Sequence, residues 1–221
     1  MIKKQTLQFL NDLNQNNNKE WFDANKSDYK AAHQNFLEFT QVLIDGLSQI
    51  DGGIQGSLLE PKKCVMRIYR DVRFAKDKSP YKSNFFAYIN KGGKKSPFGG
   101  YYFNLEPGAS FFGGGIYMPE SKVLTNIRQE ISFNHQEWLK IVEGKKLLDF
   151  YGEVKYSGKL TRPPKGFEKN DPAIEWLKYK GFYTQKPLSD DEVLNAKLLE
   201  NIISGYEVVK PLIDFINESV D

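Results

Sequence analysis

The sequence predicts a single α+β domain, in which an antiparallel sheet of about four or more strands packs against helices from both ends of the chain. Three observations lead to this prediction. Apolar residues recur at helical spacing in residues 1–50, aromatic and β-branched residues crowd into residues 63–117, and helical spacing returns in residues 119–221. We find no internal repeat and no clear linker, so one domain is expected for residues 1–221.

The N-terminal part is expected to hold a short helix, a turn and a long helix. The first helix is marked by three leucines, Leu7, Leu10 and Leu13. Asparagines 16–18 then interrupt the pattern and offer a cap for a turn that carries Trp21 and Phe22, whose predicted role is packing. The apolar residues of the long helix are spaced by three and four: Tyr29, Ala32, Phe36, Phe39, Leu43, Leu47 and Ile50. Residues 51–53 end it.

Four strands are predicted in the middle of the chain, at residues 64–69, 84–90, 100–105 and 111–117. Short turns rich in glycine and proline join the later ones, which indicates antiparallel pairing. Residues 72–81 are expected to form a long loop or a bent edge between the first two strands. Glycines 113–115 interrupt the last strand and predict a bulge. The alternatives are a close backbone approach and a nest of N–H groups for an anion.

The C-terminal part again has helical spacing. Pro119 fits a first helical turn, and a further helix is expected between Asn134 and Gly144. Residues 151–170 are predicted to be irregular, and the Asp-Pro pair at 171–172 caps a short helix. Ser189 and Glu192 form a capping box for a terminal helical run, which we expect to break near Gly205 and to bend at Pro211.

Composition disfavours several classes of protein. No apolar run approaches the roughly 20 residues that span a bilayer, and the N-terminus lacks the features of a secretion signal, so a cytoplasmic protein without a membrane partner is expected. The single Cys64 excludes an internal disulfide. With only His33 and His135 besides, a zinc site is disfavoured. The sequence does not identify a cofactor or an oligomeric state.

Arginine is concentrated in one short stretch. Three of the five arginines, Arg67, Arg70 and Arg73, fall within seven residues, and residues 62–95 carry eleven basic side chains against two acidic ones. This segment therefore has a charge of +9 in a chain whose net charge is +3. The guanidinium group pairs bidentately with carboxylate or phosphate. The stretch predicts a site for a small anionic ligand.

The predicted ligand-binding residues all lie between 67 and 82, with Tyr81 orienting the ligand: Arg67, Arg70, Asp71, Arg73, Asp77, Lys78, Tyr81 and Lys82. Because side chains alternate across a strand, the three arginines converge only if the chain bends after Arg70. The structural alternative is that Asp71 and Asp77 neutralise the arginines within the fold. In that case Arg70→Ala should lower thermal stability and leave ligand binding unaffected.

Two further functions are consistent with the same region. Thirteen aromatic residues lie within residues 69–117, and basic residues interleaved with aromatics are typical of sheets that bind single-stranded nucleic acid. Catalysis has weaker support, because no Ser/His/Asp set and no nucleophile motif is found. Asp71 or Asp77 would be the candidate base or magnesium ligand, and Tyr81 or Lys78 the candidate acid.

At these residues the sequence resembles a bacterial and fungal domain family of unknown function, marked by the pattern R-x-x-R-D-x-R-F followed by D-K and a tyrosine. Eight residues stand in that pattern: Arg67, Arg70, Asp71, Arg73, Phe74, Asp77, Lys78 and Tyr81. Residues 7–10 and 17–22 resemble a second signature of that family. The resemblance implies no activity, but it singles out residues 67–82 as the part of the chain to examine.

Overall fold

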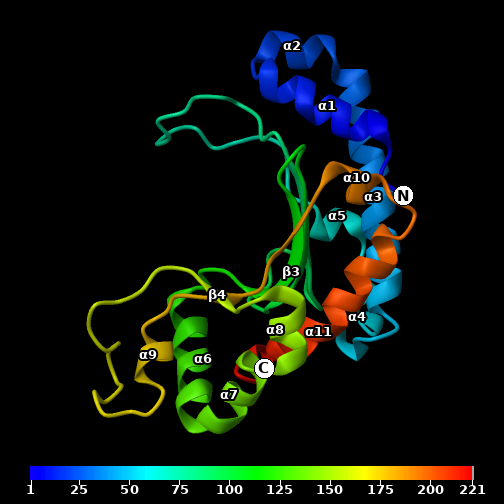
Figure 1. Ribbon diagram of the computed structural model, residues 1–221. Coiled ribbons are helices and arrows are strands. Elements are labelled where there is room, and N and C mark those ends of the chain that lie inside the picture. The colour runs from blue at the N-terminus through cyan, green and yellow to red at the C-terminus, as the bar shows by residue number, and fades with distance from the viewer. Residues whose placement is uncertain (221) are drawn as a thin grey trace.

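The computed structural model describes residues 1–220 and has an α+β fold built on one antiparallel sheet (Figure 1). Its centre is formed by β1 (Phe85–Ile89), β2 (Gly100–Leu105) and β3 (Ser110–Ile116). The far edge of β3 pairs with β5 (Phe182–Tyr183) at one end and with β6 (Lys186–Leu188) at the other, and β4 (Lys155–Tyr156) pairs with β5. The predicted fold class is confirmed.

The strand predicted at residues 64–69 is wrong. Pro61 starts a helical turn, α5 (Pro61–Cys64), which takes in Cys64. Beyond it, Val65 forms an isolated bridge to Ala87, and Tyr69 forms one to Tyr81. The two bridges are four positions apart on the first segment and six positions apart on the second, so no continuous ladder forms between them. Residues 65–69 nevertheless run along the outer edge of β1.

Helices cover one face of the sheet. α3 (Lys26–Leu47) packs against β1, and α11 (Leu198–Glu218) packs against β3. α1 (Lys4–Gln15) packs on α3, and α2 (Lys19–Ala24) begins at Asn18, whose side chain caps it as predicted. α4 (Gly52–Gln55) follows α3, and Asp51 caps it. Phe36 and Phe39 of α3 meet Phe103 of β2 in the core between the layers.

The C-terminal part departs from the prediction in several places, among them the unpredicted short strands β5 and β6. α11 runs without a break through Gly205 and Pro211. The segment predicted to be irregular contains β4, and an unpredicted helix, α8 (Lys145–Tyr151), starts after Gly144. The other helices lie close to their predicted positions, and the capping box of α10 is present: α6 (Ser121–Phe133), α7 (His135–Val142), α9 (Ile174–Leu177) and α10 (Asp190–Leu194).

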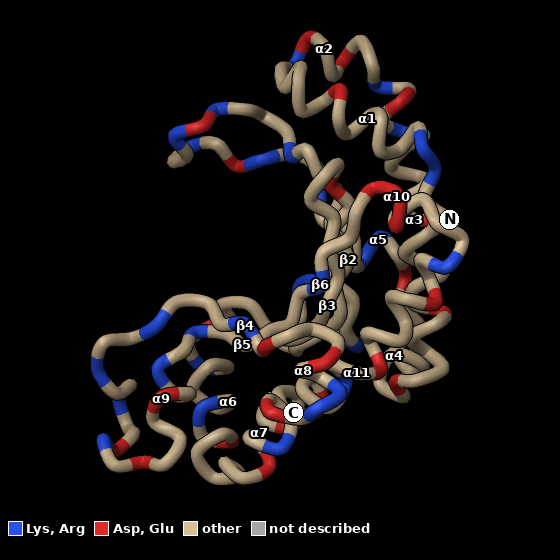
Figure 2. Tube along the Cα trace, in the orientation of Figure 1, with Lys and Arg blue, Asp and Glu red and all other residues tan. Residues whose placement is uncertain are grey.

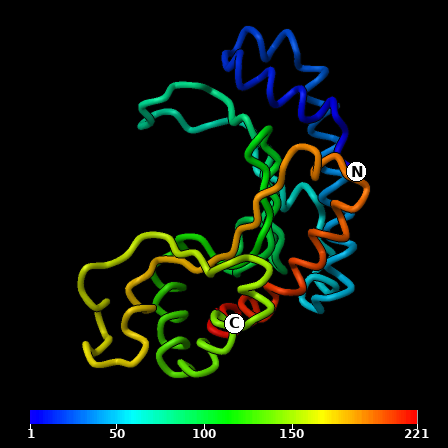
Figure 3. Tube along the Cα trace, in the orientation of Figure 1, coloured from blue at the N-terminus to red at the C-terminus, as the bar shows by residue number. Residues whose placement is uncertain are grey.

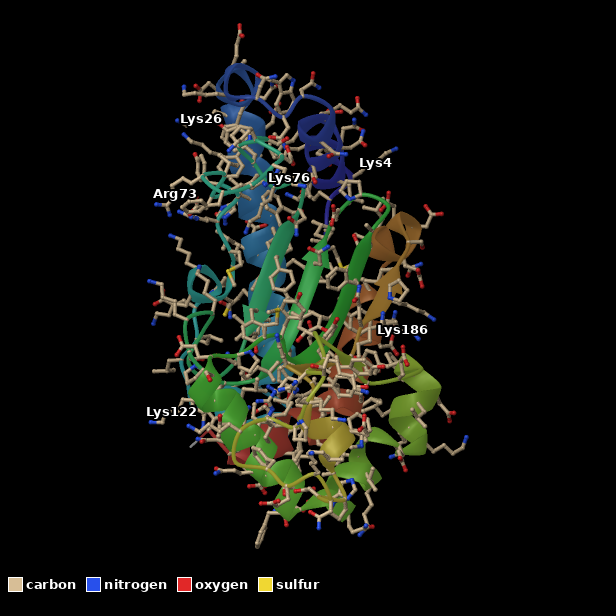
Figure 4. The ribbon with its side chains drawn as sticks, turned by 90° about the vertical axis from the view of Figure 1, so that its left-hand side faces the viewer. Lys4, Lys26, Arg73, Lys76, Lys122 and Lys186 are labelled. Atoms are coloured by element: carbon tan, nitrogen blue, oxygen red, sulfur yellow. The ribbon has the colours of Figure 1, made fainter. Side chains whose placement is uncertain are left out.

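Two parts of the chain project from the sheet on the side away from α3 and α11 (Figures 1 and 3). One is a long loop, residues 70–80, which we call the arm. The other contains α6, α9 and β4. Figure 4 looks onto the sheet from this side, with Arg73 and Lys76 of the arm above the strands and Lys122 of α6 below them. No helix in residues 1–220 is long and apolar enough to cross a bilayer.

Candidate functional site

The arm is closed at its base by backbone pairing. The Arg70 N–H donates to the Pro80 carbonyl at 2.9 Å, and the Lys82 N–H donates to the Ile68 carbonyl at 2.8 Å. The Tyr81 ring is buried and stacks on Phe22 of α2, with ring centres 3.9 Å apart. The backbone of Tyr81 is also bonded at both its N–H and its carbonyl by the Asn17 side chain. Tyr81 therefore anchors the arm to the N-terminal helices.

Asp77 is the internal partner of Arg70. The two side chains form an ion pair, and Asp77 also accepts hydrogen bonds from the Ser79 N–H at 2.9 Å and the Ser79 hydroxyl at 2.6 Å. These hydrogen bonds from Ser79, together with the ion pair, hold the pKa of Asp77 well below its usual range. Arg70 thus carries a counter-ion that is fixed in place at neutral pH.

Asp71, Arg73 and Lys78 also bond within the arm. Arg73 donates to both oxygens of Asp71, at 2.9 and 2.7 Å, and both side chains are exposed. The Lys78 Nζ atom donates to the carbonyl of Val72 at 3.0 Å. Figure 2 shows the arm as a projecting loop on which basic and acidic residues follow one another. These three predicted site residues stabilise the arm's own conformation.

The structure brings four predicted residues, Arg70, Asp77, Tyr81 and Lys82, together around a hollow of about 340 Å³ between the arm and the end of α1. Its walls are polar, and we call it the polar pocket: Asn14, Asn17, Arg70, Asp77, Ser79, Tyr81, Lys82, Ser83 and Asn84. Sequence reasoning missed the asparagines as pocket residues, because their position depends on how α1 and α2 pack beside the arm.

Lys82 and Arg67 are neighbouring cations at the base of the arm. Lys82 is half-buried, and within residues 1–220 neither side chain has a carboxylate partner or a side-chain hydrogen bond. Burial lowers the pKa of Lys82, and the nearby positive charge of Arg67 lowers it further. The lining of the polar pocket has two cations, Arg70 and Lys82, and one carboxylate, Asp77, so it carries a net positive charge.

A second hollow, of about 770 Å³, lies over the sheet face that α3 and α11 leave open, and we call it the aromatic cavity. β1 alternates, so that Phe86 and Tyr88 face the cavity while Phe85 and Ala87 face the helices. Rings supply much of the lining: Phe86, Tyr88, Phe98, Tyr102, Phe111, Tyr117 and Tyr183. Sequence reasoning noted all of these aromatics except Tyr183 but did not divide them between the two faces of the sheet.

Glycines 113–115 lie in β3, where Gly115 lines the aromatic cavity and Gly114 lies against Val209 and Ile213 of α11. β3 pairs with β2 in unbroken register through all three, so the predicted bulge is absent. The close backbone approach, which was the alternative, is what the structure shows: a Cβ on Gly113 would collide with the Thr184 carbonyl. The N–H of Gly114 donates to the Thr184 hydroxyl at 3.3 Å, so it is not part of an anion nest.

Comparison of the sequence with known protein families shows which family the chain belongs to. A family model described as conserved hypothetical protein (DUF2461) matches residues 5–215. The chain belongs to this family. No curated protein and no solved structure matches it.

Within residues 1–220 of this DUF2461 member, no three His, Cys, Asp or Glu side chains come together in an arrangement that could hold a metal ion. Asp71 and Asp77, the candidate magnesium ligands, are instead paired with arginines. The arrangement can bind an anion through fixed cations and amides, and it offers a neighbouring wall of aromatic rings.

Proposed function

We propose that the protein binds a small ligand carrying a phosphate or carboxylate group in the polar pocket, with Lys82 and Arg70 as its cationic contacts and the positive charge of Arg67 beside Lys82. The supporting observation is the pair formed by Lys82 and Arg67, two neighbouring positive charges without a carboxylate partner among the described residues. Their mutual repulsion is relieved when an anion lies between them.

The remaining motif residues have supporting roles in this proposal. Asp77 fixes the Arg70 guanidinium at the pocket wall, and Tyr81 fixes the arm base against α2. Asp71, Arg73 and Lys78 hold the shape of the arm through their bonds to each other and to its backbone. Ligand contact is thus assigned to fewer residues than the motif contains.

Isothermal titration calorimetry with inorganic phosphate and citrate tests the proposal. We expect Lys82→Met to weaken binding by about tenfold or more, because a hydrogen bond to a charged group contributes roughly 1.5–3 kcal/mol. Lys76→Met is the matched control: Lys76 is an exposed lysine of the same arm, outside the polar pocket. It should leave the affinity within about twofold, apart from the general loss of one surface charge. Equal losses for the two variants would refute a specific site.

One observation favours single-stranded nucleic acid as a second candidate. Phe74 at the arm tip is 95% exposed and lies between the basic Arg73 and Lys76. An exposed ring flanked by cations is suited to stacking on a base. This function requires binding to DNA or RNA oligonucleotides that falls steeply with salt and is lost in Phe74→Ala. Salt-insensitive or absent binding would exclude it.

A further inference from the structure

We infer that the anionic group of the ligand is joined to a flat aromatic ring, and that this ring lies in the aromatic cavity against Phe86 and Tyr102. The ligand class is therefore a nucleotide, or another aromatic phosphate of similar size. The inference rests on the proposed anion site and extends it to the rest of the ligand.

The two hollows are neighbours on one strand face. Asn84, just before β1, lines the polar pocket, and Phe86 lines the aromatic cavity. Residues two apart on a strand point to the same face and lie about 7 Å apart. Asn104, opposite Phe86 in β2, is hydrogen-bonded to Asn84 and so joins the two regions across the sheet. A ligand with a charged end and a flat end can span this short distance.

The aromatic side chains of the cavity wall are held in orientations that suit contact with a flat ring. Phe86 and Tyr102 are nearly parallel, with ring centres 5.9 Å apart and planes at 22°. The Tyr88 hydroxyl donates to the Phe98 carbonyl at 2.9 Å, and the Tyr102 hydroxyl donates to the Thr184 carbonyl. Both tyrosine rings are therefore held in place before a ligand arrives, which reduces the entropy lost on binding. A volume of about 770 Å³ is within the range of small-molecule sites.

Polar side chains also line the aromatic cavity and can contact the edge of a bound ring. Gln185 and Glu120 line the cavity, and neither side chain has a hydrogen-bond partner among residues 1–220. The Glu120 carboxylate disfavours an anion nearby but accepts hydrogen bonds from the N–H groups at the edge of a base. Lys94 and Lys95 also line the cavity and keep their positive charges, although the Nζ atom of Lys94 is bonded to the carbonyls of Lys62 and Val65. The ring is assigned to this cavity because aromatic side chains supply much of its wall, and the charged end to the polar pocket because the walls there are polar.

The inference is tested by titrating the full chain with inorganic phosphate, phenyl phosphate, the four nucleoside monophosphates and adenosine. We expect phenyl phosphate and at least one nucleotide to bind about tenfold or more tightly than inorganic phosphate, because stacking of a base on an aromatic side chain contributes at this scale. Phe86→Leu, which keeps an apolar side chain but removes the flat ring, should abolish that gain and leave phosphate affinity unchanged. Phe74→Leu, on the exposed arm tip, is the control and should change neither.

The outcomes separate this inference from the proposed function. Phosphate binding that depends on Lys82, with no gain from any ring, would refute the inference and leave the anion site standing. If neither phosphate nor any nucleotide binds, the anion site is refuted and the inference with it. If oligonucleotides bind through Phe74 while mononucleotides do not, the inference is overturned in favour of nucleic acid.

Discussion

Gly205→Ala is a direct test of how α11 packs on the sheet that carries the aromatic cavity. Gly205 lies in the interior of α11, where glycine is ordinarily unfavourable. A Cβ at this position would lie 2.5 Å from a ring carbon of Phe112 and 2.7 Å from a ring carbon of Phe150. It would also lie 2.8 Å from the Tyr151 hydroxyl. Glycine is present because the helix backbone touches aromatic rings there.

Two opposing terms set the expected magnitude. Replacing glycine by alanine in a helix interior stabilises by about 0.8–1 kcal/mol. Overpacking a close-packed core costs about 1–3 kcal/mol, and Phe112 is fully buried and has little room to move. The net expectation is a loss of roughly 1 kcal/mol, which for a chain of this size lowers the melting temperature by about 2–4 °C.

Gly46→Ala is the matched control. Gly46 lies in α3, and its added Cβ would meet only the Ile203 side chain, whose terminal carbon is 2.7 Å away and can rotate aside. This variant should be neutral or stabilised by up to about 1 kcal/mol. The unfolding free energies of the two variants, measured by urea denaturation, should therefore differ by about 1–2 kcal/mol. Equal stabilisation of both variants would show that Gly205 is not constrained by the rings beside it.

Three further predictions concern the site and the fold. Asp77→Asn should raise phosphate affinity severalfold in calorimetry, because the amide oxygen can still accept the hydrogen bond that fixes Arg70 while the competing negative charge is removed. Unchanged affinity would place Arg70 outside the anion site. Burial raises the pKa of the Cys64 thiol to about 12, so native protein should resist iodoacetamide at pH 8. The stabilising contribution of the neutral thiol is complete below pH 8–9 and is lost as pH rises toward 12, as urea denaturation against pH would show. Ser189→Ala should cost about 1 kcal/mol by urea denaturation, and because its hydrogen bonds lower the pKa of Glu192, that cost should shrink as pH falls below about 4.

Local signals in the sequence predicted the elements that depend on local contacts. The Asn18 cap and the Ser189 capping box involve residues three apart, so they are visible in the sequence. The helix break predicted near Gly205 was wrong, because the residues that require a glycine there belong to β3 and α8, which are far away in the chain. The short strands β4, β5 and β6 were missed for the same reason, since a strand of two or three residues has no periodicity and exists only because of its partner.

The stretch of sequence that contains the candidate site could be predicted, but the set of residues that line the site could not. The arginine concentration pointed to residues 67–82, and the structure places part of that stretch around the polar pocket. Which aspartate pairs with which arginine could not be predicted from the sequence. Arg70 pairs with Asp77, seven residues away, only because the arm folds back and brings the two side chains together. The aromatic cavity could not be predicted from the sequence, because Tyr183 and Gln185 line it from a distant part of the chain.

The arm divides the basic motif into two kinds of residue. Arg70 and Arg73 are paired with acids and shape the loop, whereas Arg67 and Lys82 flank its base on the incoming and outgoing chains without acidic partners among the described residues. The hydrogen bond from the Lys82 N–H to the Ile68 carbonyl joins these two chains, so closing the arm base is what brings the two cations together. Their repulsion opposes closure, and an anion bound beside them removes that opposition. Ligand binding and ordering of the arm base should therefore be coupled, because each provides the charge arrangement that the other requires.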